Sequence, residues 1–320
     1  MNSPLFSIIT PTYERPALLV RAIRSVIGQT FKDYEHIVVD DGNDAETARV
    51  IRSFKDPRLL FHQNSTQQGV AAARNTGIKL SRGNLLVFLD DDDEFCPDIL
   101  EKLAEYFSCP NTRIGFMWTG ITKIKDDPVG ERIIDTKIWP SRFKTQESGV
   151  VEASSIGIGF GVCIKRECID KIGLFDESMT YASDSDFLFR LAKHFECATI
   201  SESLIKIHLH DNPQLTDANN NRARLEMRQK ILATHRDLLM MYPQLYCVHY
   251  RVVADLAYNL GLKKEGRRTM IAIIKKMPLR FSYYVDFLSY ELSGAAYCQS
   301  KVNRIINIFK KLIKMIFFKR

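Results

Sequence analysis

The sequence predicts an α/β fold, with a three-layer α/β/α domain followed by a helical C-terminal extension. Strand-like and helix-like segments alternate over the first 90 residues, a pattern typical of a sheet covered by helices on both faces. After Asn219-Asn220-Asn221 every segment is helix-like. We therefore expect two domains, 1–217 and 218–320, with a boundary near residue 217.

The first 90 residues are expected to form the strands at the centre of the sheet and the helices between them. A first strand is expected over Phe6–Pro11, because proline cannot donate to a strand ladder and marks its exit. Pro16 suits the first turn of the following helix. The next elements are a strand over 35–40, a helix over 45–54, a strand over 59–62, a helix over 70–81 and a strand over 85–89. The last strand has five consecutive apolar residues, which indicates a central position with both faces buried.

Beyond residue 90 the apolar patterns that predict helices and strands are weaker. We expect a helix over 97–107, strands over 114–125 and 132–138, a helix over 166–172, a helix with an acidic front over 181–192, and closing strands over 196–200 and 203–209. The glycine-rich segment 157–161 keeps side chains small where the backbone approaches something closely, or is a packed strand. The extension should hold helices over 225–241, 248–260, 266–276 and 283–290.

The composition is that of an ordinary globular protein of 320 residues, with 45% hydrophobic and 26% charged residues. No apolar run approaches the ~18 residues of a transmembrane helix, and the first seven residues are too short for a secretory signal. Seven cysteines without a Cys-x-x-Cys pair are expected to be reduced. We therefore expect a cytoplasmic protein.

Four aspartates, Asp90 to Asp93, directly follow the predicted central strand. Because side chains alternate along an extended backbone, Asp90 and Asp92 should point the same way, as an oxygen pair suited to Mg²⁺ or Mn²⁺. A calcium loop is disfavoured by Phe95 and Pro97, and a solvated charge run is the plainer alternative. Four like charges at one strand end are unfavourable without a counter-cation, so a metal site is the favoured reading.

Five segments together carry a family resemblance. These are Ser7-Ile8-Ile9-Thr10-Pro11-Thr12-Tyr13, Ile37-Val38-Val39-Asp40-Asp41-Gly42, Ala73-Arg74-Asn75-Thr76-Gly77, Phe88-Leu89-Asp90-Asp91-Asp92-Asp93, and Asp184-x-Asp-Phe-x-x-Arg-Leu-Ala. In this order they resemble the inverting family 2 glycosyltransferases of the GT-A fold, over about the first 215 residues. The resemblance implies a nucleotide-sugar donor.

The resemblance also implies roles for particular residues. Asp41 matches the residue that recognises the base, with a helix N-cap as its structural alternative. Asp92 matches the metal ligand, and the cofactor is Mn²⁺ or Mg²⁺. His210 resembles a histidine that completes the metal site in some relatives, with a structural histidine as its alternative. Asp184 matches the general base, although Ser183 replaces the usual glutamate before it, and Asp186 is the second candidate. The other expected donor-binding residues are Thr10, Pro11, Tyr13, Glu14, Arg74, Asp90 and Asp91.

The function implied is transfer of a hexosyl or N-acetylhexosaminyl group from a UDP-sugar to a glycan or a lipid-linked acceptor in bacterial polysaccharide biosynthesis. A dTDP-sugar is the competing donor, since thymine shares the N3–H of uracil. A catalytically inactive sugar-nucleotide or glycan-binding module is the main alternative. A sugar nucleotidyltransferase would need a Gly-rich, Arg- and Lys-bearing loop after the first strand, which residues 10–16 do not form.

The C-terminal tail combines apolar and basic residues. Residues 263–320 hold 14 Lys or Arg against 3 Asp or Glu, and residues 301–320 place apolar residues at three- and four-residue steps. A core-packing helix would explain the apolar stripe but not such one-sided charge. Because the tail lacks an aromatic platform on which bases could stack, we do not expect it to bind nucleic acid. The pattern predicts a helix lying on an anionic membrane surface, at the inner face of the cell membrane.

Overall fold

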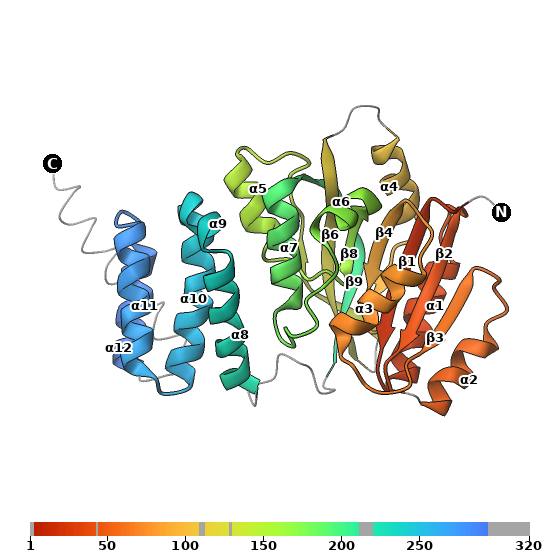
Figure 1. Cartoon of the computed structure of the whole chain (residues 1–320), viewed down its shortest axis with the longest axis horizontal. Helices are drawn as coiled ribbons and strands as arrows, with labels where there is room; N and C mark the ends of the chain where they lie inside the picture. Colours follow the sequence, from red (N-terminus) through yellow and green to blue (C-terminus); the bar gives the residue numbers. More distant parts are fainter. Residues whose placement is uncertain (1–2, 43, 109–112, 128–129, 211–219, 294–320) are drawn as a thin grey trace. The chain divides into compact units, whose positions relative to one another are not determined.

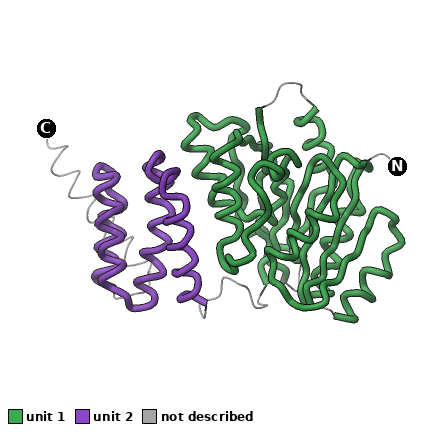
Figure 2. Tube along the Cα trace, in the orientation of Figure 1, with its two compact units in different colours: residues 1–213 green, residues 214–320 purple. Residues whose placement is uncertain are grey.

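The computed structural model describes residues 3–42, 44–108, 113–127, 130–210 and 220–293. The chain divides into two compact units, residues 1–213 and residues 214–320 (Figure 2). The boundary expected near residue 217 and the tail helix expected over 301–320 lie outside the described residues.

Unit 1 is built on a mixed sheet (Figure 1). Among its described residues the strand order is β3 (Leu59–Gln63), β2 (Tyr34–Asp40), β1 (Phe6–Thr12), β4 (Leu85–Leu89), β8 (Phe160–Lys165), β6 (Ile114–Asp127), β9 (Glu196–Leu209) and β5 (Glu94–Phe95), and β7 (Gly130–Lys137) pairs with β6. Strand β4 is central, as predicted, and pairs with β1 in parallel and with β8 antiparallel.

Helices cover both faces of this sheet, which confirms the predicted three layers. Val38 of β2 packs with residues of α1 (Pro16–Ile27) and α2 (Ala45–Ser53), whereas its neighbours Ile37 and Val39 pack with Ala73 of α3 (Val70–Leu80). Successive side chains of a strand point to opposite faces, so α1 and α2 lie opposite α3. The remaining helices are α4 (Ile99–Phe107), α5 (Gln146–Ala153), α6 (Arg166–Ile172) and α7 (Ser183–His194).

Several predicted boundaries differ from the structure. Strand β1 continues through Pro11 to Thr12, because its pairing with β4 ends at Ile9 and the missing N–H of Pro11 interrupts no ladder on that side. The two closing strands expected over 196–209 form one strand, β9, whose pairing with β6 shifts register near Gly120. Helix α5 and the two-residue strand β5 have no clear periodicity in the sequence.

Unit 2 consists, in its described part, of α8 (Asn221–Thr234), α9 (Arg236–Met241), α10 (Pro243–Asn259), α11 (Lys263–Lys276) and α12 (Ser282–Ser293). The single helix expected over 225–241 is two helices joined at His235. The core includes Tyr258, which stacks on Tyr290 at 4.5 Å between ring centroids, and Met270. Among the described residues, no helix is both long and apolar enough to cross a membrane.

Candidate active site

The carboxyl ends of β1 and β4 meet at one edge of the sheet. Their parallel pairing sets Ile9 opposite Phe88, so three residues further on Thr12 reaches Asp91. The Thr12 hydroxyl donates to Asp91 Oδ2 at 2.7 Å, and both residues are buried. In open α/β sheets the ligand crevice lies outside this edge, which is where the acidic residues collect.

The four aspartates do not continue the strand. β4 ends at Leu89, and the Asp93 N–H donates to the Asp90 carbonyl at 3.3 Å, which closes a turn. The prediction that an extended backbone points Asp90 and Asp92 the same way is therefore wrong. In the structure the two carboxylates contact different partners, Arg74 and His210.

Arginine side chains supply much of the counter-charge at this turn, which sequence reasoning missed. Arg15 donates to Asp92 Oδ2 at 3.1 Å and lies 3.6 Å from Asp91. Arg21 of α1 donates to the Asp92 carbonyl at 2.8 Å and to Asp126 at 3.0 Å. Arginines of the chain itself therefore supply part of the positive charge that the aspartates were predicted to need.

Burial disfavours the ionised form of three aspartates of this turn. Burial, more than any neighbour, raises the pKa of Asp91 to about 7, and it also raises the pKa of Asp90. The pKa of Asp93 is raised well above its usual range by burial and then by the charges of Asp92 and Asp90. Arginine side chains compensate the negative charge of these carboxylates only in part. The turn therefore favours the binding of additional positive charge.

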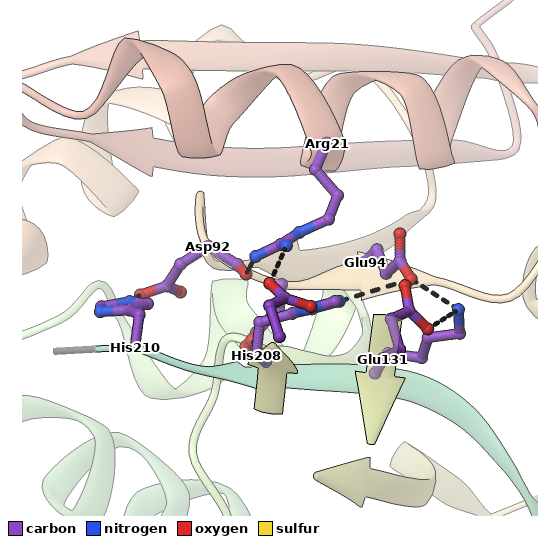
Figure 3. Close-up of polar contacts among 9 residues, drawn as sticks. Arg21, Asp92, Glu94, Glu131, His208 and His210 are labelled. Carbon is purple, nitrogen blue, oxygen red and sulfur yellow. Dashed lines mark hydrogen bonds and ion pairs between the residues drawn. The ribbon is translucent and has the colours of Figure 1, made fainter. Parts of the chain in front are cut away.

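His210 meets Asp92 as predicted by the resemblance. Its Nε2 lies 2.9 Å from Asp92 Oδ2, and its Nδ1 is buried without a hydrogen-bond partner among the described residues. Figure 3 shows Arg21 reaching this turn from α1, with His208 in β9 and His210 just past the end of that strand. One carboxylate and one imidazole therefore converge from β4 and β9.

A second cluster of carboxylates and histidine lies beside the Asp92 and His210 pair. It is formed by Glu94, Glu131 and His208 (Figure 3). Within it, the ammonium of Lys206 lies 2.8 Å from Glu94 and 3.1 Å from Glu131. His208 is buried, and its Nδ1 lies 3.3 Å from Asp126. This group already contains a cation of its own, so we regard it as a structural ion-pair network.

Arg74 joins the predicted base to the aspartate turn. Its guanidinium donates to Asp184 Oδ1 at 2.6 Å and to Asp90 Oδ1 at 2.9 Å. Only 3% of Arg74 is exposed, so it is not a surface arginine. The backbone N–H of Ile158 donates to Asp184 Oδ2 at 3.0 Å, and the Asp184 side chain is 30% exposed. Asp184 is thus fixed in orientation but open to a ligand.

Asp186, the second candidate base, lies in a different environment. It is 4% exposed and pairs with Arg190 of the same helix at 2.8 Å. Asp184 is ion-paired as well, so exposure distinguishes the two carboxylates, and a buried one is poorly placed to accept a proton from an acceptor sugar. The structure therefore favours Asp184 over Asp186.

The turn before α7 is tied to α3. Asn75 donates to the Phe175 carbonyl at 3.0 Å and to Glu177 at 2.8 Å, and it accepts from the Phe175 N–H at 2.9 Å. Since Arg74 precedes Asn75 in α3, both ends of the Arg74–Asp184 contact belong to elements that are held together. Sequence reasoning did not predict this support.

Asp41 does not hold the helix N-cap position considered as its alternative, because the N-cap residue of α2 is Asp44 and that of α3 is Gly69. The Asp41 carboxylate accepts from the Asn64 side chain at 2.7 Å, from the Gly69 N–H at 2.7 Å and, through both oxygens, from the Gln68 N–H at 3.0 and 3.1 Å. A carboxylate can accept about four hydrogen bonds, so these contacts fill its acceptor positions. A base can bind this carboxylate when the Gln68 N–H gives up one of its two contacts.

The predicted donor-binding residues in the last part of β1 are buried, and those just after it are exposed. Thr10 is fully buried and hydrogen-bonds His36 Nε2 at 3.0 Å, and burial lowers the pKa of His36 to about 3, so this is an interior contact. Pro11 is also buried, in β1. Tyr13 is 40% exposed, and Glu14 is exposed with φ 51°, the one positive φ outside glycine among the described residues. Of these four, Tyr13 and Glu14 are open to a donor.

Gly159 explains part of the glycine-rich segment. Its carbonyl accepts from the Asp90 N–H at 3.2 Å, and a Cβ at this position would lie 2.1 Å from the Asp90 carboxylate. At Gly161, with φ 66°, a Cβ would lie 2.1 Å from Ile205. The predicted close approach of the backbone is therefore confirmed at both glycines.

Replacing Gly159 by alanine should displace Asp90 from Arg74. We expect turnover to fall by about a hundredfold, because an ångström-scale shift of positioning groups costs about that much, and the free energy of unfolding to fall by about 1–3 kcal/mol. Steady-state rates and thermal melts would measure both. Gly157→Ala, whose Cβ meets only the Phe160 ring at 3.1 Å, is the matched control. Wild-type turnover in Gly159→Ala would show that this contact is dispensable.

Comparison with known proteins identifies the family. The family model described as "Glycosyl transferase family 2" matches residues 7–173, just over half of the chain. The chain belongs to glycosyl transferase family 2. A Haemophilus influenzae protein named as an uncharacterized glycosyltransferase is 31% identical over 226 residues, which are 69% of this chain and 75% of that protein. The predicted resemblance is confirmed, and the protein is a glycosyltransferase.

Two further likenesses complete the comparison. The transferase is 38% identical over 101 residues to a putative colanic acid biosynthesis glycosyl transferase of Escherichia coli, covering 31% of this chain and 36% of that one. The structure of S. aureus TarS residues 1–349 in complex with UDP-GlcNAc has a TM-score of 0.62, with 16% identity, and covers 91% of this chain and 93% of that one. This likeness confirms the predicted GT-A-type fold of the transferase.

Proposed function

We propose that this glycosyltransferase moves a sugar, with inversion, from a nucleotide-sugar to a hydroxyl of its acceptor. The observation that supports this most is the Arg74 bridge, which sets Asp184 next to the aspartate turn. Inverting transfer needs these two parts together: a site for the nucleotide diphosphate and a carboxylate base on the opposite side of the sugar.

The chemistry proposed for Asp184 is general-base catalysis. The acceptor oxygen attacks the anomeric carbon while the bond from that carbon to the diphosphate oxygen breaks, and the hydroxyl proton passes to the Asp184 carboxylate. Arg74 and the Ile158 N–H each donate to one oxygen of that carboxylate. The Ser183 hydroxyl also donates to Oδ1, at 3.5 Å, so Oδ2 is the oxygen that keeps a lone pair for the proton, and these donors fix the direction of the carboxylate.

A divalent cation fits the Asp92 and His210 pair. One carboxylate oxygen and one imidazole nitrogen converge 2.9 Å apart beside three further aspartates whose charge is incompletely balanced. Because Mg²⁺ is bound almost entirely by oxygen, the nitrogen makes Mn²⁺ the better fit of the two. When bound, the cation would neutralise charge that develops on the departing diphosphate. Arg15 contacts the same Asp92 oxygen and also pairs with Asp91, so it places a second positive charge beside the proposed cation position.

We propose a UDP-sugar as the donor. The Gln68 N–H contacts both Asp41 oxygens, so one of them can exchange this contact for the N3–H of uracil or thymine, whereas cytosine has no such proton. The TarS structure was solved with UDP-GlcNAc, which supports the same class of donor. Hexosyl and N-acetylhexosaminyl groups are both compatible with this proposal.

A thermal-shift series tests the donor. With Mn²⁺ present, UDP should raise the melting temperature more than GDP or CMP at equal concentration, because a ligand that binds only the folded state stabilises it. Equal protection by dTDP would widen the proposal to both nucleotides, since thymine carries the same N3–H. Stronger protection by GDP than by UDP would refute it.

For the acceptor, we propose a glycan or a lipid-linked intermediate of bacterial polysaccharide assembly. The colanic acid relative supports this setting. The basic, apolar pattern of residues 301–320 supports attachment to the inner face of the cell membrane, where lipid-linked acceptors are found. Release of labelled sugar from a UDP-sugar onto such an acceptor would be the direct assay.

A further inference from the structure

Two helix ends of unit 2 lie next to each other. Helix α9 ends at Met241 and helix α11 at Lys276. The Lys276 ammonium donates to the Met240 carbonyl at 3.4 Å and lies 3.9 Å from the Met240 sulfur. The turn 277–281, which follows α11, therefore lies at the same end of this helical unit as the end of α9.

Apolar side chains are concentrated at this end. Leu279 is 98% exposed, Met241 66%, Met240 51% and Phe281 46%, and Tyr284 is exposed beside them. We call these five residues the apolar tip. The turn that carries Leu279 is well organised, because the Tyr284 hydroxyl donates to the Pro278 carbonyl at 3.0 Å and the Phe281 and Tyr284 rings lie 6.3 Å apart. Leu279 is therefore held outward by ordered structure.

Basic residues predominate around the apolar tip. Segments 236–242 and 275–284 contain four basic residues, Arg236, Lys275, Lys276 and Arg280, and one acid, Asp237. Lys276 lies over the Tyr246 ring at 5.6 Å and Arg280 over the Tyr283 ring at 5.5 Å. Such contacts seat long cationic side chains on the apolar surface while leaving their charged ends near solvent.

Exposed apolar side chains surrounded by basic residues are suited to a lipid surface that carries negative charge. Burial of apolar side chains at the bilayer interface and attraction of basic residues to anionic headgroups add together, the latter by roughly fivefold in affinity per basic residue. We propose that the apolar tip docks unit 2 on an anionic lipid bilayer. The inference deepens the membrane attachment proposed above by adding a contact separate from residues 301–320.

Vesicle binding of the full chain tests the tip. Binding should be measured by sedimentation with phosphatidylcholine vesicles, with and without about a third of phosphatidylglycerol. Leu279→Ser combined with Phe281→Ser should weaken binding to the anionic vesicles by about tenfold or more, since two large apolar side chains are lost from the interface. Ile133→Ser combined with Ile138→Ser, at exposed apolar positions of unit 1, is the matched control and should bind as wild type.

A third double variant separates the tip from the tail. Ile305→Ser with Phe309→Ser interrupts the apolar stripe of residues 301–320 in the full chain. If the tip variant binds like wild type while the tail variant does not, the tip proposal is overturned and the attachment through the tail stands. If only the tip variant is impaired, the tip proposal holds and the attachment through the tail fails. Unchanged protection by UDP in every variant would show that the donor site and the fold are intact.

A variant that keeps the tip apolar guards against misfolding. The chain has two tryptophans, Trp118 and Trp139, both buried, so Leu279→Trp adds a reporter at the surface. Its emission should shift to shorter wavelength with anionic vesicles and less with neutral ones. An unchanged spectrum, or a shift on self-association without vesicles, would overturn the proposal in favour of a contact between copies of the chain.

Discussion

Replacing Asp92 by asparagine is expected to abolish glycosyl transfer, with a loss of at least about a hundredfold. Loss of groups that merely support a metal ligand already costs 10–100-fold, and Asp92 is the proposed ligand itself. The neutral amide also removes the partner that Arg15 and His210 share at 3.1 and 2.9 Å. Initial rates with saturating UDP-sugar across a Mn²⁺ titration would measure the effect.

The control for Asp92 is Asp98→Asn, the same change at an exposed aspartate paired with Lys102. That variant should retain wild-type rates. Wild-type transfer by Asp92→Asn in excess chelator would contradict the proposed metal site. Chelator alone should inhibit the unaltered enzyme and leave its thermal unfolding nearly unchanged, because Arg15, Arg21 and Arg74 still contact the aspartate turn.

Replacing Asp184 by asparagine should have a different signature. Turnover should fall by about 10²–10⁴-fold, the range that a positioned general base contributes. The affinity for UDP should change little, because the amide keeps its shape and its oxygen can still accept from Arg74 or Ile158. Calorimetric binding of UDP together with single-turnover rates would separate the two effects.

Asp186→Asn is the matched comparison, two residues further along α7. Because Asp186 pairs with Arg190 and is buried, its replacement should affect stability more than turnover. Collapse of UDP affinity in Asp184→Asn would assign Asp184 to the donor site. A severe loss of turnover in Asp186→Asn alone would make Asp186 the base.

The elements of unit 1 were largely predictable from the sequence because their signals are local. Short apolar runs located β1 to β4, helical spacing located the helices between them, and the strand-end rule placed the aspartates at the carboxyl edge. Helix α5 escaped because only part of it is apolar and its ends carry no strong signal. The split at His235 escaped because one apolar pattern runs through α8 and α9.

The contacts within the site were less predictable because they depend on pairing between distant segments. Arg15 lies 77 residues from Asp92 in sequence, and Arg74 lies 110 residues from Asp184. Thr12 and Arg15 could have been proposed from the β1 and β4 pairing, since both follow a strand end at the same edge. No pattern within the sequence indicated the turn at Asp90–Asp93 or the contacts of Asp41 with Asn64, Gln68 and Gly69.

The central claim is that Asp92 and His210 together hold the cation that serves the donor. A crystal structure of the full chain with UDP and Mn²⁺, recorded at the manganese absorption edge, would test it most directly. We predict an anomalous peak at a coordination distance of roughly 2.0–2.3 Å from both an Asp92 oxygen and His210 Nε2. A peak at Glu94, Glu131 and His208 instead, or no peak near Asp92 with UDP bound, would contradict the account.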